Sequence, residues 1–265
     1  MLSAVTTTLG HTDRGTGTPL MFLHAFPLHA EMWTPQLTAL SALARVLTVD
    51  APGRGRSASM SPVPSLDDRA VQICALLDLL KIPKVVLVGL SMGGYSAFAF
   101  YRRFPDRVLA LVLADTRAQA DTPEARAGRT AMIRTAETQG HGPIADAMLP
   151  KLLGKTAHET RPDLVQQVRA MIHSVPIPAI VSDLQAMAAR PDSTDLLPTI
   201  RVPTLIIVGD EDVPSPPADA REMADRLPQP QLAVLTHAGH LSNLEQPEAF
   251  NQAMKDFLGT LKGKT

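Results

Sequence analysis

The sequence has one cysteine, almost no net charge and no long apolar run, and each shortage excludes a class of protein. The single cysteine, Cys74, excludes a fold held by disulfide bonds within the chain. Its place in an apolar helical pattern indicates a buried structural thiol. The chain has 25 Lys and Arg against 26 Asp and Glu, a formal net charge of -1, and no basic stripe. This balance argues against a nucleic-acid partner or an anionic membrane surface.

The N-terminal residues and the hydropathy predict a cytoplasmic protein. Residues 1–10 lack the basic start and apolar stretch of a secretory signal. No apolar stretch reaches the length of about 20 residues that a transmembrane helix needs. With 265 residues, 45% of them hydrophobic and 19% charged, the chain is expected to be globular, as one large α/β domain or two small ones.

The rest of the chain is organised around residues 84–94. The apolar run at 85–88 predicts a strand buried on both faces of a parallel sheet. A G-x-S-x-G turn follows at 89–93, and a helix is predicted over 95–104, where Pro105 stops it. A serine between a strand and a helix lies on a tight turn near backbone N–H groups that favour negative charge. This context, rather than the motif alone, predicts that Ser91 is a nucleophile.

Strands and helices alternate on both sides of this stretch. A weak alternation at 4–9 suggests an edge strand, and further strands are predicted at 19–23, 46–49, 108–113, 202–208 and 232–235. Helical patterns occur at 35–43, 65–80, 217–226 and 247–261. Turn residues fill 10–18. Ser65 is expected to cap its helix, with Asp67 and Asp68 in the first turn. The alternation predicts the α/β class, with a mostly parallel, doubly wound sheet.

The alternation stops after Asp115. Only helical patterns occur before residue 202, at 122–138, 143–153, 162–173 and 179–189. An excursion of roughly 85 residues between two strands predicts a helical cap over the edge of the sheet that carries the functional loops. We therefore expect a core of residues 1–116 and 202–265, with a cap of residues 117–201.

A serine nucleophile needs a base, a group that orients the base, and donors for an oxyanion. In an open α/β sheet these groups come from loops at the carboxyl ends of the strands. The best acid is Asp212, after the strand at 202–208, and the best base is His240, after the last strand. The competing side chains are Asp210, Glu211, Asp115 and His237. The competing carboxylates are expected to be solvated.

No metal and no cofactor are expected. His237 and His240 lie on a turn without a third ligand nearby, so they form a weak metal candidate. The oxyanion donors are expected to be backbone N–H groups. One is that of Met92, which follows the nucleophile, and the other is that of Phe26, in the loop after the strand at 19–23.

Five blocks of sequence resemble the serine-nucleophile branch of the α/β-hydrolase fold. The chain is similar to capped bacterial esterases, cofactor-free haloperoxidases and perhydrolases, and 3-oxoadipate enol-lactonases. The blocks are H-A-F-P at 24–27, D-x-x-G-x-G-x-S at 50–57, G-x-S-x-G-G at 89–94, G-x-x-D-x-x-x-P at 209–216 and G-H…E-x-P at 239–247. The fourth block favours Asp212 over Asp210. Ala25 departs from the family's usual glycine, and serine at position 91 disfavours the aspartate-nucleophile dehalogenases and epoxide hydrolases.

The resemblance implies acyl transfer, in which Ser91 attacks a carbonyl, His240 relays the proton and Asp212 holds the imidazole. We expect hydrolysis of small or medium carboxylic esters, with acyl transfer to peroxide as a side activity suggested by Pro27. One alternative is an enol-lactone or carbon–carbon bond hydrolase of aromatic catabolism. An alternative of another class is a non-catalytic receptor for a small ligand.

The cap composition bears on the substrate and on assembly. Core packing is expected for most of its methionines, Met132, Met148, Met171 and Met187. Surface positions are expected for most of its arginines, Arg117, Arg126, Arg129 and Arg134, which could instead receive a carboxylate. The exposed face of the cap is a candidate interface for a homodimer.

Overall fold

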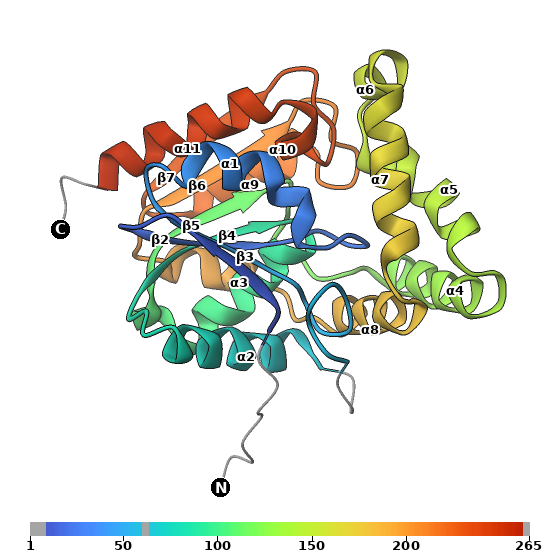
Figure 1. Cartoon of the computed structure of the whole chain (residues 1–265), viewed down its shortest axis with the longest axis horizontal. Coiled ribbons are helices and arrows are strands. Elements are labelled where there is room, and N and C mark those ends of the chain that lie inside the picture. Colours follow the sequence, from blue (N-terminus) through green and yellow to red (C-terminus); the bar gives the residue numbers. More distant parts are fainter. Residues whose placement is uncertain (1–8, 60–63, 262–265) are drawn as a thin grey trace, which may run out of the picture.

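A seven-stranded sheet forms the centre of a computed structural model that describes residues 9–59 and 64–261 (Figure 1). The strand order is β1-β3-β2-β4-β5-β6-β7. The strands are β1 (His11–Arg14), β2 (Pro19–Leu23), β3 (Arg45–Val49), β4 (Val85–Leu90), β5 (Val108–Ala114), β6 (Thr204–Gly209) and β7 (Pro230–Leu235). β1 pairs antiparallel with β3, and the other neighbouring pairs are parallel. The predicted mostly parallel sheet is confirmed.

Helices cover both faces of this sheet. One face carries α1 (Thr34–Leu40) and α11 (Pro247–Leu261), and the other carries α2 (Leu66–Leu79), α3 (Met92–Arg103) and α9 (Pro217–Arg226). Alternate side chains of β4 enter the two cores, Val86 and Val88 on the first face and Val85 and Leu87 on the second. Since successive side chains of a strand point to opposite faces, a strand between two helical layers is apolar at every position.

The region 10–18, predicted as turn, contains β1, so this expectation is wrong. The sequence His-Thr-Asp-Arg has no apolar run that would predict a strand. It is a strand because its backbone pairs with β3, with His11 opposite Val49 and Arg14 opposite Val46. Apart from Leu9, the strand predicted at 4–9 lies outside the described residues.

The predicted start of α2 is confirmed in detail. The Ser65 hydroxyl accepts a hydrogen bond from the Asp68 N–H at 3.1 Å, and the Asp68 carboxylate accepts one from the Ser65 N–H at 2.9 Å. Two N–H groups that a helix start leaves without an intrahelical acceptor are thereby paired. The carboxylates of Asp67 and Asp68 also lie at the positive end of the helix dipole.

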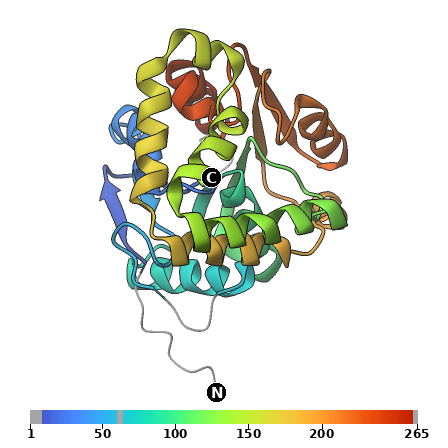
Figure 2. The same ribbon diagram turned by 90° about the vertical axis from the view of Figure 1, so that its right-hand side faces the viewer.

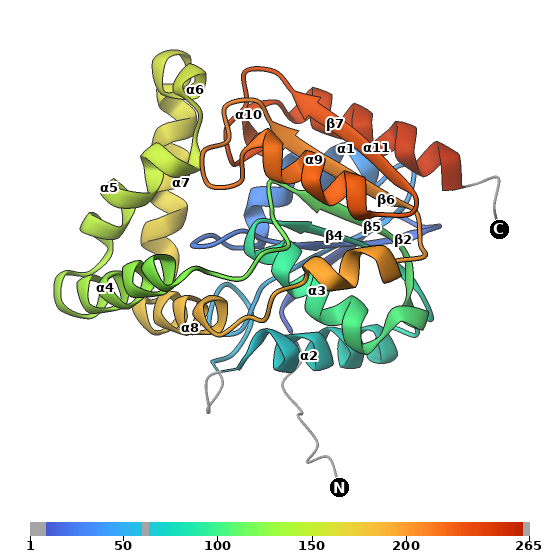
Figure 3. The same ribbon diagram turned by 180° about the vertical axis from the view of Figure 1, so that it is seen from behind.

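Between β5 and β6 the chain forms a helical insertion, residues 123–188, at one end of the sheet (Figures 1 and 3). Figure 2 shows it facing the viewer, with the sheet behind it. Its helices are α4 (Pro123–Gln139), α5 (His141–Leu152), α6 (Lys155–Thr160), α7 (Pro162–Ser174) and α8 (Ile177–Ala188). The sequence predicts all but α6, whose six residues are too few to show an apolar stripe.

Four more short helices escape prediction for the same reason. They are η1 (Ala30–Trp33), η2 (Pro105–Arg107), η3 (Thr194–Thr199) and α10 (Ser242–Glu245). Each spans six residues or fewer, so none repeats its apolar positions often enough to indicate a helix. None of the helices in the described ranges is both long and apolar enough to cross a membrane.

A buried group of three charges joins the helical insertion to the core. The Asp183 carboxylate of α8 lies 2.5 Å from Arg54, in the loop after β3, and 2.8 Å from Arg69 of α2. Burial by itself would raise the pKa of Asp183, but the two guanidinium groups outweigh it and hold this pKa below its ordinary value. The carboxylate is therefore ionised at neutral pH, and it is shared by two guanidinium groups, so the three side chains together keep one positive charge.

Cys74 is half-buried rather than fully buried, which corrects the expectation from its helical pattern. It lies on α2, and a guanidinium nitrogen of Arg107 approaches its sulfur at 3.3 Å. Burial raises the pKa of the thiol more than Arg107 lowers it. The neutral thiol therefore predominates at neutral pH, which suits a packing role.

Candidate active site

Ser91 lies on the sharp turn between β4 and α3, where the sequence places it. Its backbone has φ 55° and ψ -115°, a conformation that L-residues rarely adopt. The flanking glycines make this turn possible. A Cβ atom at Gly89 would collide with the Gly93 backbone, and one at Gly93 would collide with the Leu23 carbonyl. The motif therefore reflects the close approach of three backbone segments.

Ser91, His240 and Asp212 form one continuous chain of hydrogen bonds. The Ser91 Oγ atom lies 2.8 Å from His240 Nε2, and both carboxylate oxygens of Asp212 lie 2.9 Å from His240 Nδ1. A carboxylate only accepts hydrogen bonds, so the ring proton is on Nδ1 and Nε2 accepts from the serine hydroxyl. The fold brings together side chains that are 149 and 28 residues apart in the sequence. All three are buried.

Ser215 holds the Asp212 carboxylate in place, and sequence reasoning missed it. Its N–H donates to one carboxylate oxygen at 3.0 Å and its hydroxyl donates to the other at 3.2 Å. The signal in the sequence is an Asp followed three residues later by Ser, a spacing at which an Asp side chain bonds to the backbone of its own turn. With these donors in place, Asp212 presents its oxygens to the imidazole in a fixed orientation.

Of the competing groups, only Asp210 and His237 are exposed. Asp210 therefore meets the expectation of a solvated carboxylate, but Glu211 and Asp115 do not. Glu211 accepts hydrogen bonds from the N–H and the hydroxyl of Thr156, at 2.9 and 2.5 Å, and so attaches α6 to the loop that carries Asp212.

Asp115 is fully buried behind the chain of hydrogen bonds. Its carboxyl group accepts from the Gly209 N–H at 3.0 Å and lies 2.5 Å from the Ser242 hydroxyl. Burial, followed by the nearby charge of Asp212, raises its pKa well above the ordinary value. Asp115 thus braces the loops on either side of the sheet edge, one carrying Asp212 and the other His240. The expectation that it is solvated is wrong, because β5 ends inside the protein.

A cavity of about 300 Å³ opens at Ser91 and His240. Met132, Met148 and Met187 line it. Core packing, expected for most of the cap methionines, is confirmed for Met171 and Met187, which belong to the hydrophobic core, and Met132 and Met148 are half-buried and pack against that core. The four arginines of the cap fall into two groups, one exposed and one lining the cavity. Arg126 and Arg134 are exposed as expected, whereas Arg117 and Arg129 line the cavity together with Lys151. The helical insertion therefore supplies both apolar and positively charged surface to the cavity.

The positive charge of this wall is only partly compensated. Arg129 and Arg190 both bond to the buried carboxylate of Asp121, and Arg117 lies 3.6 Å from it. Burial by itself would raise the pKa of Asp121, but hydrogen bonds and charge from the arginines lower it. One carboxylate thus faces three guanidinium groups. No Asp or Glu lines the cavity within the described ranges of the chain.

The two predicted oxyanion donors belong to Met92, which follows Ser91 in the chain, and to Phe26. Met92 is the first residue of α3, so its N–H has no acceptor within the helix. Phe26 lies in the loop after β2, is buried, and lines the cavity with Ser91. Its side chain belongs to the hydrophobic core, and the role of its N–H as an oxyanion donor stays a prediction. In the part of the chain that the structure describes, no cluster of three or more His, Cys, Asp or Glu could hold a metal.

The fold and this arrangement of side chains define an α/β-hydrolase. Residues 20–253 match the alpha/beta hydrolase family, and the chain belongs to it. A structure of a thermophilic esterase from Thermogutta terrifontis, with malate bound, is 40% identical, with a TM-score of 0.93 over 96% of this chain and 93% of that chain. The enol-lactonase of Burkholderia xenovorans is 31% identical, with a TM-score of 0.88 over 97% and 99%. The 3-oxoadipate enol-lactonase 2 of Acinetobacter baylyi is 29% identical over 94% of this chain and 90% of its own.

Proposed function

We propose that this protein is a serine hydrolase that cleaves small or medium carboxylic esters through an acyl-enzyme on Ser91. The observation that carries the proposal is the hydrogen bond of 2.8 Å between Ser91 Oγ and His240 Nε2, at the base of the cavity. A serine hydroxyl becomes a useful nucleophile when a base of this kind takes its proton. The esterase and enol-lactonase relatives support the same reaction class.

The geometry supports the following sequence of steps. Ser91 Oγ attacks the ester carbonyl while His240 Nε2 takes its proton, and Asp212 stabilises the resulting imidazolium. The N–H groups of Phe26 and Met92 receive the negative charge on the carbonyl oxygen. His240 then protonates the leaving alcohol, and the acyl-enzyme forms. Water, deprotonated by His240, then attacks the acyl carbon, the bond from that carbon to Ser91 Oγ breaks, and His240 returns the proton to Oγ as the acid leaves. Peroxide in place of water would give a peroxyacid, the side activity predicted from Pro27.

We propose further that residues 117–201 act as a cap. Met132 of α4 lines the cavity together with Leu184 and Met187 of α8. A cavity closed by such side chains favours an apolar acyl or alcohol group and limits its size. Methionine side chains adapt to irregular shapes, which suits a range of short chains.

Hydrolysis of p-nitrophenyl esters from acetate to decanoate tests the proposed function. We expect turnover to peak at short to medium chains, because a cavity of about 300 Å³ cannot enclose a decanoyl chain and the leaving group together. A fluorophosphonate should label the protein stoichiometrically, with the added mass on Ser91. If the wild-type protein neither turns over the esters nor reacts with the probe, the proposal fails and a ligand-binding role gains support.

A second candidate, hydrolysis of an anionic ester or lactone, is favoured by the positively charged cavity wall. Arg117 is the best carboxylate ligand, because it is the most distant of the three arginines from Asp121 and its Nε atom is buried without a protein acceptor in the described ranges. The enol-lactonase relatives and the malate-bound esterase are compatible with a carboxylate here. A guanidinium group can pair with a substrate carboxylate in bidentate fashion.

Replacing Arg117 with Met separates the two candidates. Ethyl hydrogen succinate and ethyl 4-methylpentanoate have acyl groups of the same shape, one with a terminal carboxylate and the other neutral. We expect R117M to lower kcat/KM for the succinate ester about 10- to 100-fold, the loss of a hydrogen bond to a charged group, and to leave the neutral ester unaffected. Titration of the released acid gives both rates. The exposed Arg134→Met is the matched control, and an equal effect of R117M on both esters would exclude the anionic substrate.

A further inference from the structure

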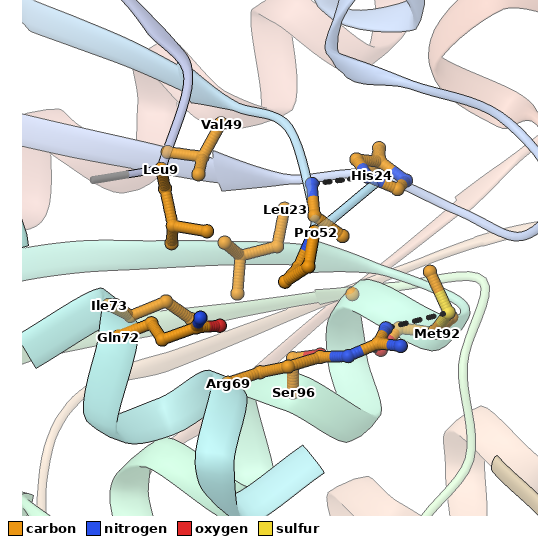
Figure 4. A pocket seen from close by; sticks show the side chains of 12 residues that line it. Leu9, Leu23, His24, Val49, Pro52, Arg69, Gln72, Ile73, Met92 and Ser96 are labelled. Carbon is orange, nitrogen blue, oxygen red and sulfur yellow. Dashed lines mark hydrogen bonds between the residues drawn. The ribbon is translucent and has the colours of Figure 1, made fainter. Parts of the chain in front are cut away.

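His24 is a buried histidine outside the chain of hydrogen bonds that contains Ser91. It directly follows β2, at the start of the loop that carries Phe26, and only 3% of it is exposed. Its Nδ1 atom lies 2.9 Å from the carbonyl oxygen of Ala25, and its Nε2 atom lies 3.0 Å from the N–H of Ala51. Figure 4 shows the ring at the edge of a small pocket that Met92 also lines, with Met92 below His24 in this view.

The protonation of His24 follows from these partners. Burial, assisted by the charge of Arg54, lowers its pKa to about 4, so the ring is neutral at neutral pH. A neutral imidazole has one donor and one acceptor nitrogen. The Ala51 N–H can only donate, so Nε2 accepts and the proton is on Nδ1. The ring therefore donates a hydrogen bond to the Ala25 carbonyl.

This carbonyl belongs to the same peptide group as the Phe26 N–H. A trans peptide is planar, so its C=O and N–H point in opposite directions and turn together. The Ala25 oxygen accepts from His24 Nδ1 and from the Leu28 N–H, each at 2.9 Å. Two donors on the oxygen fix the plane of the peptide and polarise it, which makes the N–H on its other side a better donor.

We propose that His24 is a positioning residue that holds the Ala25–Phe26 peptide so that the Phe26 N–H faces the oxyanion of the transition state. This inference rests on the proposed function, because it assigns no reaction of its own. His24 does not touch the substrate, since the cavity at Ser91 is lined by Phe26 and not by His24. It acts on the oxyanion only through the Ala25–Phe26 peptide group.

Two substitutions separate the donor role of His24 from its structural role. His24→Asn places an amide nitrogen where Nδ1 lies, so it keeps the donor to Ala25 and loses the acceptor for Ala51. His24→Gln places an amide oxygen near Nε2, so it keeps the acceptor and loses the donor. Each variant loses one buried hydrogen bond, so urea denaturation should show similar stabilities. Any difference in activity then reports the Ala25 contact.

We expect H24Q to lower kcat/KM for a neutral p-nitrophenyl ester about 10- to 100-fold, mainly through kcat, and H24N to retain most of the activity. The Ki of a trifluoromethyl ketone, whose adduct with Ser91 carries an oxyanion, should rise in H24Q by the same factor and stay low in H24N. Equal activity of H24Q and wild type would overturn the inference, as would equal losses in both variants. A wild-type protein that neither turns over the ester nor binds the ketone would overturn the proposed function as well.

Discussion

Replacing Ser91 with Ala, His240 with Ala, or both is expected to lower kcat for ester hydrolysis by about 10⁴- to 10⁶-fold, with nearly equal losses in the three variants. The losses should not add, because the hydroxyl and the imidazole work as one unit through their hydrogen bond of 2.8 Å. The comparison is made from initial rates of p-nitrophenyl ester hydrolysis. The enzyme concentration must be high enough to measure the residual activity of each variant.

The histidine turn supplies a matched control for this experiment. His237→Ala removes an exposed imidazole three residues before His240 and should leave kcat within about twofold, as expected for a surface substitution. Additive losses in the double variant would show that His240 acts on a different group from Ser91. Full activity of Ser91→Ala would exclude the acyl-enzyme altogether.

Removing the Asp183 carboxylate is expected to lower the free energy of unfolding by about 3 to 5 kcal/mol. Asp183 and both of its partners are at most 4% exposed, so Asp183→Asn leaves Arg54 and Arg69 with buried positive charges and no anion between them. Urea denaturation of wild type and variant, followed by circular dichroism, measures the change.

An exposed ion pair in the same helical insertion is the control for Asp183. Asp146 and Arg169 approach to 2.7 Å, but their side chains are 68% and 36% exposed. Asp146→Asn should therefore cost less than about 1 kcal/mol. If the two variants lost equal stability, the buried charges would not be what attaches α8 to the core.

Much of the fold could be predicted from the sequence because its signals are local. The apolar run of β4, the glycines around Ser91 and the cap of α2 at Ser65 each depend on residues within a few positions of one another. β1 and α6 could not be predicted, because β1 is a strand only through its pairing with β3 and α6 is too short to repeat a pattern.

For the site, the order of the motifs was enough to select Ser91, Asp212 and His240, which are hydrogen-bonded to one another in the structure. Their catalytic roles stay predictions. The sequence could not show that Asp115 is buried or that Glu211 bonds to Thr156, because a carboxylate after a strand looks the same whether the next helix covers it or not.

The sequence by itself determined the class of fold and the nucleophile turn. Both depend on residues close together in the chain: the period of apolar residues sets each strand or helix, and small residues on either side of Ser91 make the tight turn possible. The tertiary structure decided the character of the cavity. It brings Arg117, Arg129 and Met187 to the cavity that contains Ser91, and it places the His24 ring against the carbonyl oxygen of the Ala25–Phe26 peptide. These groups come from segments far apart in the chain, and only packing fixes which of their atoms face the site and which remain in water.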